Sequence, residues 1–196
     1  MPPTSVFPEA NGLYEAILAS PHDMNLRLVF ADWLEDQGNT QAKLIRLQVR
    51  LFQTAGPMAT HLEQQIAELH WRHQRQWNGP LHRFLSQTPL RGEVGSRRSR
   101  IRGWHFDRGC VESLEVEPQA VLEHAEILFR LGPIRQLRFR RPEWGLDRVL
   151  RDRRDDLLRL ESIVFPTEGD HRVIRRLNLP GVILLVGLQN PRPVVQ

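Results

Sequence analysis

Apolar residues recur every three or four positions in the first half of the chain, which is the pattern of amphipathic helices. It predicts a helical bundle over residues 1–90, with four helices and a short fifth near Leu81–Leu85. We expect Asp23 to cap the second helix and Gly38 to end it, because glycine adopts positive φ without steric cost. We expect Asn78-Gly79-Pro80 to end the fourth helix. The predicted apolar stripes consist of Leu13, Tyr14, Ile17 and Leu18; Leu26, Phe30, Trp33 and Leu34; Leu44, Leu47 and Leu51; and Leu62, Ile66, Leu69, His73 and Trp77.

From about Gly92 the pattern changes to short apolar runs separated by helical segments. The run Gly95-Ser96-Arg97-Arg98-Ser99-Arg100 is polar and free of large apolar residues, which makes it the best linker candidate. We expect the linker at about residues 91–96 and a second domain over residues 97–196. Trp104-His105-Phe106 and Cys110-Val111-Glu112 are predicted strands, and the run Asp107-Arg108-Gly109 between them predicts a tight hairpin connection.

A repeat begins after this hairpin. The run Leu131-x-x-Ile134-x-x-Leu137-x-Phe139 recurs as Leu157-x-x-Leu160-x-x-Ile163-x-Phe165 and, with one substitution, as Leu177-x-x-Pro180-x-x-Ile183-x-Leu185. A weaker first copy keeps Val111, Leu114 and Val116. The third anchors fall at 114, 137, 163 and 183, so the spacings are 23, 26 and 20, within the range of roughly 20–29 residues that leucine-rich repeats show.

This pattern predicts an α+β fold in which the helical bundle is followed by a short leucine-rich-repeat-like αβ array with a mainly parallel sheet. A compact αβ layer of parallel strands without a true horseshoe is the alternative. In the array, we expect Glu115 to lie opposite Arg138, because both come one residue after the third anchor.

Composition and charge restrict the function classes only modestly. The chain has 196 residues and a formal net charge of +4, and Lys43 is the one lysine among 27 basic residues. The single cysteine, Cys110, excludes an intramolecular disulfide. The N-terminal residues lack the pattern of a signal peptide, and the apolar run Val182–Val186 is too short to cross a bilayer, so we expect a cytoplasmic protein without membrane contact.

The first half contains two consecutive runs, Arg27-Leu28-Val29-Phe30-Ala31-Asp32-Trp33-Leu34-Glu35-Asp36-Gln37-Gly38-Asn39 and Ala42-Lys43-Leu44-Ile45-Arg46-Leu47-Gln48. These runs resemble the signature of a bacterial family, the repeat-companion domain. The stretches Phe106–Glu112 and His124–Phe129 also resemble segments that family members carry downstream of that signature, so the resemblance covers about residues 12–140. Asn39, Gln41 and Lys43 depart from the usual acidic residue, arginine and glutamate.

The resemblance implies a helical companion domain over residues 1–90 followed by repeats, and it carries over no catalytic residue. It implies structural roles for the residues of its motif. Trp33 would be a core anchor, and Asp32 or Glu35 would pair with Arg27 or Arg46. A bidentate arginine–carboxylate pair can fix the angle between two helices.

Motifs for catalysis or metal binding are weak. His70 and His73 lie at helical spacing, but no H-E-x-x-H motif accompanies them and His73 continues the apolar stripe. Cys110 lies in a predicted strand without a base to activate it. We therefore expect no catalytic residue, no metal site, no cofactor and no enzyme activity.

Two binding functions remain, and a non-catalytic protein-interaction or scaffold module is the primary one. Its partner would be another protein or a second copy, bound by an exposed strand surface whose last strand is apolar. The alternative is an accessory protein that binds RNA or DNA, in which arginines contact phosphate and an aromatic ring stacks on bases. The protein-binding surface would consist of Glu115, Gln136, Arg138, Arg140, Val164, Leu184 and Val186, and the nucleic-acid surface of Arg97, Arg98, Arg100, Arg102 and Trp104.

Overall fold

The computed structural model describes residues 5–90, 101–140, 146–165 and 179–186. Contacts divide the chain into two compact units. The helical unit comprises Met1–Pro89 together with Phe106–Cys110, and the sheet unit comprises Leu90–His105 together with Val111–Gln196. We expected Phe106–Cys110 to belong to the second domain, whereas their contacts group them with the helices. The expected linker, 91–96, lies outside the described residues.

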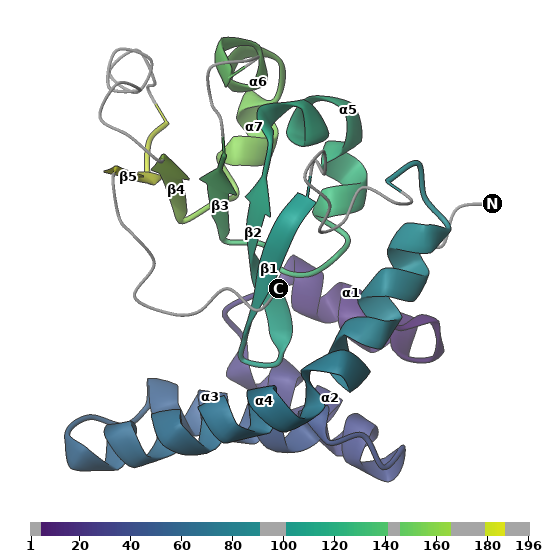
Figure 1. Cartoon of the computed structure of the whole chain (residues 1–196), viewed down its shortest axis with the longest axis vertical. Helices are drawn as coiled ribbons and strands as arrows, with labels where there is room; N and C mark the ends of the chain where they lie inside the picture. Colours follow the sequence, from purple (N-terminus) through teal and green to yellow (C-terminus); the bar gives the residue numbers. More distant parts are fainter. Residues whose placement is uncertain (1–4, 91–100, 141–145, 166–178, 187–196) are drawn as a thin grey trace. The chain divides into compact units, whose positions relative to one another are not determined.

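The helical unit contains a 3₁₀ turn and four α-helices (Figure 1). These are η1 (Pro8–Ala10), α1 (Asn11–Ala19), α2 (Met24–Asp36), α3 (Gln41–Phe52) and α4 (Pro57–Ser86). Asp23 caps α2 as predicted, because its carboxylate accepts the backbone N–H groups of Asn25 and Leu26. Gly38, with φ of 67°, ends that helix in the left-handed region, also as predicted.

The core of the helical unit is aromatic at one end. Tyr14 and Phe30 are buried, and their ring centroids lie 5.8 Å apart. Phe7 packs against both rings at 5.1 Å. Trp33, which we expected as a core anchor, stacks on Phe30 at 5.9 Å but is only half-buried. Ring packing of this kind holds α1 and α2 together.

The fourth helix does not end at Asn78-Gly79-Pro80, and the prediction of a separate fifth helix is wrong. Helix α4 continues through Pro80 to Ser86. Proline removes one backbone donor, and burial on both sides of it offsets that loss. The buried side chains on this stretch are Trp77, Leu81, Phe84 and Leu85.

In the part of the chain that the structure describes, the sheet has five strands in the order β1-β2-β3-β4-β5, and Figure 1 shows them side by side. They are β1 (Ile101–Asp107), β2 (Cys110–Val116), β3 (Gln136–Phe139), β4 (Ser162–Phe165) and β5 (Ile183–Val186). Strands β2 to β5 are parallel neighbours. The predicted α+β fold, helices followed by a mainly parallel sheet, is confirmed.

A two-residue turn joins β1 to β2, so these strands form the predicted hairpin. Arg108 and Gly109 have φ values of 45° and 74°. Positive φ at both central residues is typical of a type I′ turn, whose twist matches that of the flanking strands.

The strand register places the predicted third anchors opposite one another in three copies and corrects the alignment of the fourth. Leu114 lies opposite Leu137, and Leu137 lies opposite Ile163, as the anchors predict. Ile163 then lies opposite Leu184 rather than Ile183, so our alignment of the last copy is wrong by one residue. The cause is a turn at Pro180-Gly181, where Val182 donates to the carbonyl of Leu179 at 3.2 Å and Gly181 has φ of 82°.

Among the described residues of the sheet unit, three helices accompany the strands: α5 (Pro118–Leu128), α6 (Leu146–Asp152) and α7 (Arg154–Leu157). Figure 1 shows them grouped beside the sheet, and α5 contacts α6. The Arg153 guanidinium ties the end of α6 to α5 through two hydrogen bonds to the Leu122 carbonyl, at 2.6 and 3.0 Å. Among the described residues, no helix is both long and apolar enough to cross a membrane.

Candidate functional site

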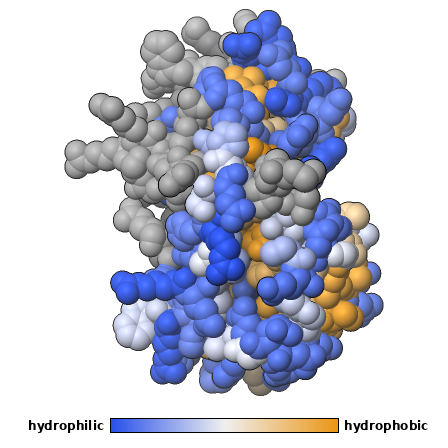
Figure 2. Space-filling model, turned by 90° about the vertical axis from the view of Figure 1, so that its right-hand side faces the viewer, coloured by the Kyte–Doolittle hydropathy of each residue, from blue (hydrophilic) through white to orange (hydrophobic). Residues whose placement is uncertain are grey.

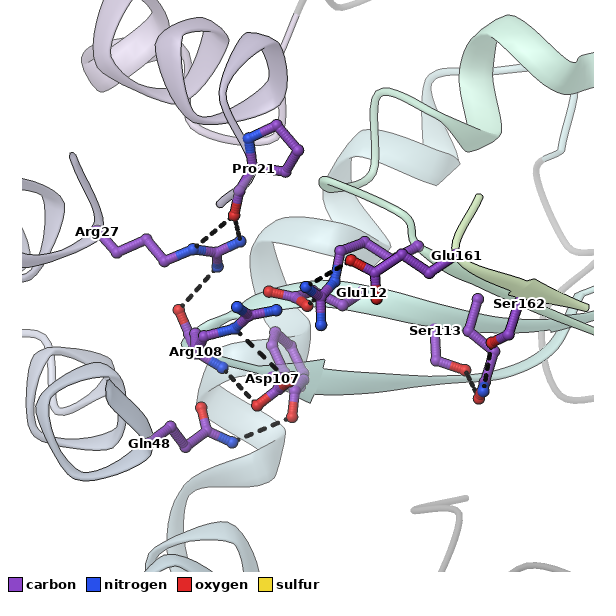
Figure 3. Close-up of polar contacts among 12 residues, drawn as sticks. Pro21, Arg27, Gln48, Asp107, Arg108, Glu112, Ser113, Glu161 and Ser162 are labelled. Carbon is purple, nitrogen blue, oxygen red and sulfur yellow. Dashed lines mark hydrogen bonds and ion pairs between the residues drawn. The ribbon is translucent and has the colours of Figure 1, made fainter. Parts of the chain in front are cut away.

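The outer face of the sheet carries two rows of side chains in register. In the first row, the Ser113 hydroxyl donates to the Gln136 carboxamide oxygen at 3.1 Å, and the Gln136 amide donates to the Ser162 hydroxyl at 3.0 Å (Figure 3). Ile183 continues this row beside Ser162. The first row therefore changes from hydrogen-bonded polar groups to an apolar residue at β5.

The second row is charged at one end and apolar at the other. Glu115 lies opposite Arg138, as predicted, and Val164 and Leu185 continue the row. The Glu115 carboxylate also pairs with the Arg140 guanidinium. We expected the whole set to be exposed, but Glu115 is 6% and Val164 is 2% exposed. Gln136 and Arg138 are partly exposed and Arg140 is exposed.

The assignment of Leu184 to this outer face is wrong. Successive residues along a strand point to opposite faces of the sheet, and Leu184 lies opposite the buried anchor Ile163. The register pairs Val186 with Phe165. The one-residue shift at Pro180-Gly181 accounts for the error at Leu184, and it places Ile183, which is 61% exposed, in the outer row instead.

A row of ion pairs that the sequence analysis did not predict connects neighbouring strands near the starts of β2, β3 and β4. Arg135 contacts Glu112 of β2 at 2.7 Å and Glu161, just before β4, at 2.9 Å (Figure 3). Arg135 and Glu161 each stand directly before their strand, at positions equivalent to Glu112. Aligning the repeats by their third anchors places Glu112, Arg135 and Glu161 at equivalent positions. The anchor spacing in the sequence could therefore have predicted these ion pairs.

The candidate nucleic-acid residues are only partly described. Arg97, Arg98 and Arg100 lie outside the described residues. Arg102 pairs with Glu117 at 2.7 Å, and Trp104 is buried. A paired arginine presents less positive field to phosphate, and a buried indole offers no open face for stacking.

The strongest polar constellation belongs to the helical unit, where helices α2 and α3 bind the tip of the hairpin. The Gln48 amide donates to the Phe106 carbonyl at 3.1 Å, and its oxygen accepts the Gly109 N–H at 2.8 Å. The Gln41 amide donates to the Gly109 carbonyl at 2.7 Å. Gln41 and Gln48 are both buried, so these bonds form away from solvent.

Arg27 completes this constellation from α2. Its guanidinium donates to the Arg108 carbonyl at 3.1 Å and to the Pro21 carbonyl at 2.7 and 3.3 Å, as Figure 3 shows. The side chain is 0% exposed. Of the two pairings offered for the motif carboxylates, Arg46 is the partner, with Asp32 at 2.8 Å and Glu35 at 2.7 Å. These two hydrogen bonds raise the pKa of Arg46.

Two side-chain contacts add selectivity for the turn sequence. The Arg108 guanidinium lies 5.4 Å from the centroid of the Phe52 ring, a cation–π distance. Gly109 packs so closely that a Cβ atom there would lie 1.8 Å from Cγ1 of Ile45. We call Arg27, Gln41, Ile45, Gln48 and Phe52 the turn site.

The residues singled out for metal binding or catalysis lie in packed surroundings. The His70 and His73 rings lie 5.2 and 5.8 Å from the Trp77 ring. Cys110 is buried beside the turn. Within the described ranges, no group of three or more histidine, cysteine, aspartate or glutamate side chains could hold a metal ion.

Comparisons with protein-family models, with curated proteins and with solved structures find no match.

Proposed function

We propose that this chain is a non-catalytic protein-interaction module that binds its partner through the strand face of the sheet unit. The observation that carries the proposal is the outer row that runs from Ser113 through Gln136 and Ser162 to Ile183. Parallel strands in register place equivalent side chains side by side, and such rows form the extended binding surfaces of repeat proteins.

The character of the row indicates where binding energy would come from. Ser113, Gln136 and Ser162 are already hydrogen-bonded to one another, so they contribute shape and polarity rather than unmet donors. Ile183 lies in the last strand of the described sheet and exposes 61% of its surface. Apolar side chains at the centre of an interface contribute most of the affinity, and a polar rim supports them.

Other exposed apolar side chains are scattered over the chain rather than aligned in register. In Figure 2 the visible face is mostly hydrophilic, with apolar residues gathered in a few places. Isolated exposed apolar residues are common on soluble proteins and carry little information by themselves. Besides Ile183, the large ones among the described residues are Val29, Phe52, Met58, Trp71 and Leu158.

The test compares two matched aspartate substitutions in the full chain. Ile183→Asp places a charge in the outer row, and Leu158→Asp places one at an exposed leucine directly after α7 in the same unit. We expect light scattering, or affinity capture from extracts of the source cells, to show an association that Ile183→Asp abolishes and Leu158→Asp retains. A strictly monomeric protein with no co-purifying partner would contradict the proposal, as would equal loss in both variants.

A further inference from the structure

The hairpin tip is bound by the helices in the way that a ligand is bound. A two-residue hairpin satisfies its own backbone only across the turn, and the N–H and C=O groups of the central residues normally bond to water. Here the Arg108 carbonyl and both backbone groups of Gly109 bond to side chains of Arg27, Gln41 and Gln48. The helices supply every one of these partners.

The same contacts define what the turn site can recognise. Most of these contacts are hydrogen bonds to backbone groups of the turn, as in other modes of peptide recognition that use backbone hydrogen bonds. Ile45 excludes any side chain at the second turn position, because a Cβ atom on Gly109 would overlap it. At the first turn position the site encloses Arg108, which is 1% exposed and faces the Phe52 ring. The recognised element is therefore an Arg-Gly turn of type I′.

The helical unit obtains this turn from a remote part of the sequence. Helices α2 and α3 lie within residues 24–52, whereas the turn is at Arg108-Gly109. The segment Phe106–Cys110 is the one part of the helical unit that lies beyond Pro89. A segment of this kind can be supplied by a second molecule, as in domain swapping, where one protomer takes an identical element from another.

We propose that the turn site is a recognition site for Arg-Gly β-turns, filled in cis by Phe106–Cys110 and able to bind the same turn of a second copy of this chain. The proposal concerns a surface of the helical unit and does not depend on the strand face of the sheet unit. Its occupant is defined by backbone geometry and by the Arg-Gly pair.

The experiment prevents the full chain's own Arg108-Gly109 turn from occupying the turn site and supplies the same turn on a separate peptide. Gly109→Val prevents the chain's own turn from entering, because the valine side chain would overlap Ile45 and valine resists positive φ. The probe is a fluorescent cyclic peptide that contains the sequence Trp104–Glu112, used under reducing conditions, and the control is the same peptide with valine in place of glycine.

We expect the Gly109→Val protein to bind the glycine peptide at least about ten-fold more tightly than the valine peptide, and more tightly than the wild-type protein does. Equal binding of both peptides, or none by a variant with wild-type helix content, would overturn the proposal. If the variant has lost helix, recovery of the circular dichroism signal on adding the glycine peptide supports the proposal, and failure to recover overturns it.

Discussion

The carboxamide of Gln48 makes two hydrogen bonds to the hairpin at once: its oxygen accepts the Gly109 N–H at 2.8 Å, and its nitrogen donates to the Phe106 carbonyl at 3.1 Å. The side chain is buried, so neither backbone group has an alternative partner in bulk water once the amide is removed. One helical glutamine therefore holds both ends of a turn that lies 61 residues away in the sequence.

Replacing this amide by an apolar group of similar size will destabilise the protein. In Gln48→Leu, two buried backbone groups lose their partner, and each unsatisfied group costs about 1–3 kcal/mol. We expect a lower free energy of unfolding in urea, with the m-value unchanged. Gln64→Leu, on an exposed position of α4, is the control and should stay within about 0.5 kcal/mol of wild type. A Gln48→Leu protein as stable as that control would contradict the role of this amide.

Gly109 and Gly38 form a matched pair for the close approach at the turn. Both have positive φ, 74° and 67°, but a Cβ atom on Gly109 would overlap Ile45, whereas one on Gly38 would meet nothing within 4 Å. We expect Gly38→Ala to cost about 1–2 kcal/mol for backbone strain alone. Gly109→Ala should cost roughly 1–3 kcal/mol more, because overpacking adds to that strain.

The excess cost at Gly109 can be assigned to Ile45 by a double-mutant cycle. Ile45→Ala removes Cγ1 and Cδ1, the two atoms nearest to the added methyl group. In the Ile45→Ala background, Gly109→Ala should therefore cost less than in wild type, with a coupling of about 0.5–3 kcal/mol by urea denaturation. Additive effects would show that Ile45 is not the obstacle.

Local patterns predicted most of the elements and the register of the first strands. Asp23 and Gly38 marked the limits of α2, and the anchor spacing placed Glu115 opposite Arg138. The predicted helix end at Pro80 is wrong because burial of the neighbouring side chains outweighs the loss of one backbone hydrogen bond. The predicted register of the last repeat is wrong because Pro180 was treated as a repeat anchor. It lies instead in a turn, and the pairing of β5 with β4 is shifted by one residue.

The turn site could not be predicted, because its parts carry no periodic signal. A buried glutamine such as Gln48 looks like any polar residue on a helix until its distant partner is known. The aligned repeats likewise give no indication that Phe106–Cys110 belongs to the helical unit. Long-range hydrogen bonds to a backbone turn depend on tertiary proximity, which sequence spacing does not encode.

Tyr14 provides a pH-dependent test of the helical core. Burial raises its pKa well above the usual value of 10.0, and a nearby Cys110 raises it further. A raised pKa in the folded state means that the folded protein holds its proton at pH values where the unfolded chain releases it. Stability from Tyr14 is therefore complete below about pH 10 and is lost as pH rises above it.

The chain has one tyrosine, so tyrosinate absorbance reports this side chain alone. We expect no tyrosinate signal from the folded protein near pH 10, and its sudden appearance when alkaline unfolding begins. Tyr14→Phe should reduce the loss of unfolding free energy between neutral pH and about pH 11, because it removes the proton that unfolding releases. Gradual titration of Tyr14 around pH 10 with the fold intact would contradict its burial.

Gly132→Ala tests the close packing of the sheet unit, and Gly12→Ala, in α1 of the helical unit, is a control for which we expect the opposite effect on stability. A Cβ atom on Gly132 would lie 2.1 Å from the carbonyl oxygen of Val111, whereas one on Gly12 in α1 would meet nothing within 4 Å. Gly132→Ala should cost roughly 1–3 kcal/mol, since a backbone carbonyl cannot move aside as a flexible side chain can. Gly12→Ala should raise the free energy of unfolding by up to about 1 kcal/mol, because alanine favours helix over glycine. Urea denaturation of the full chain measures both values, and a Gly132→Ala protein as stable as wild type would show that this loop does not pack on β2.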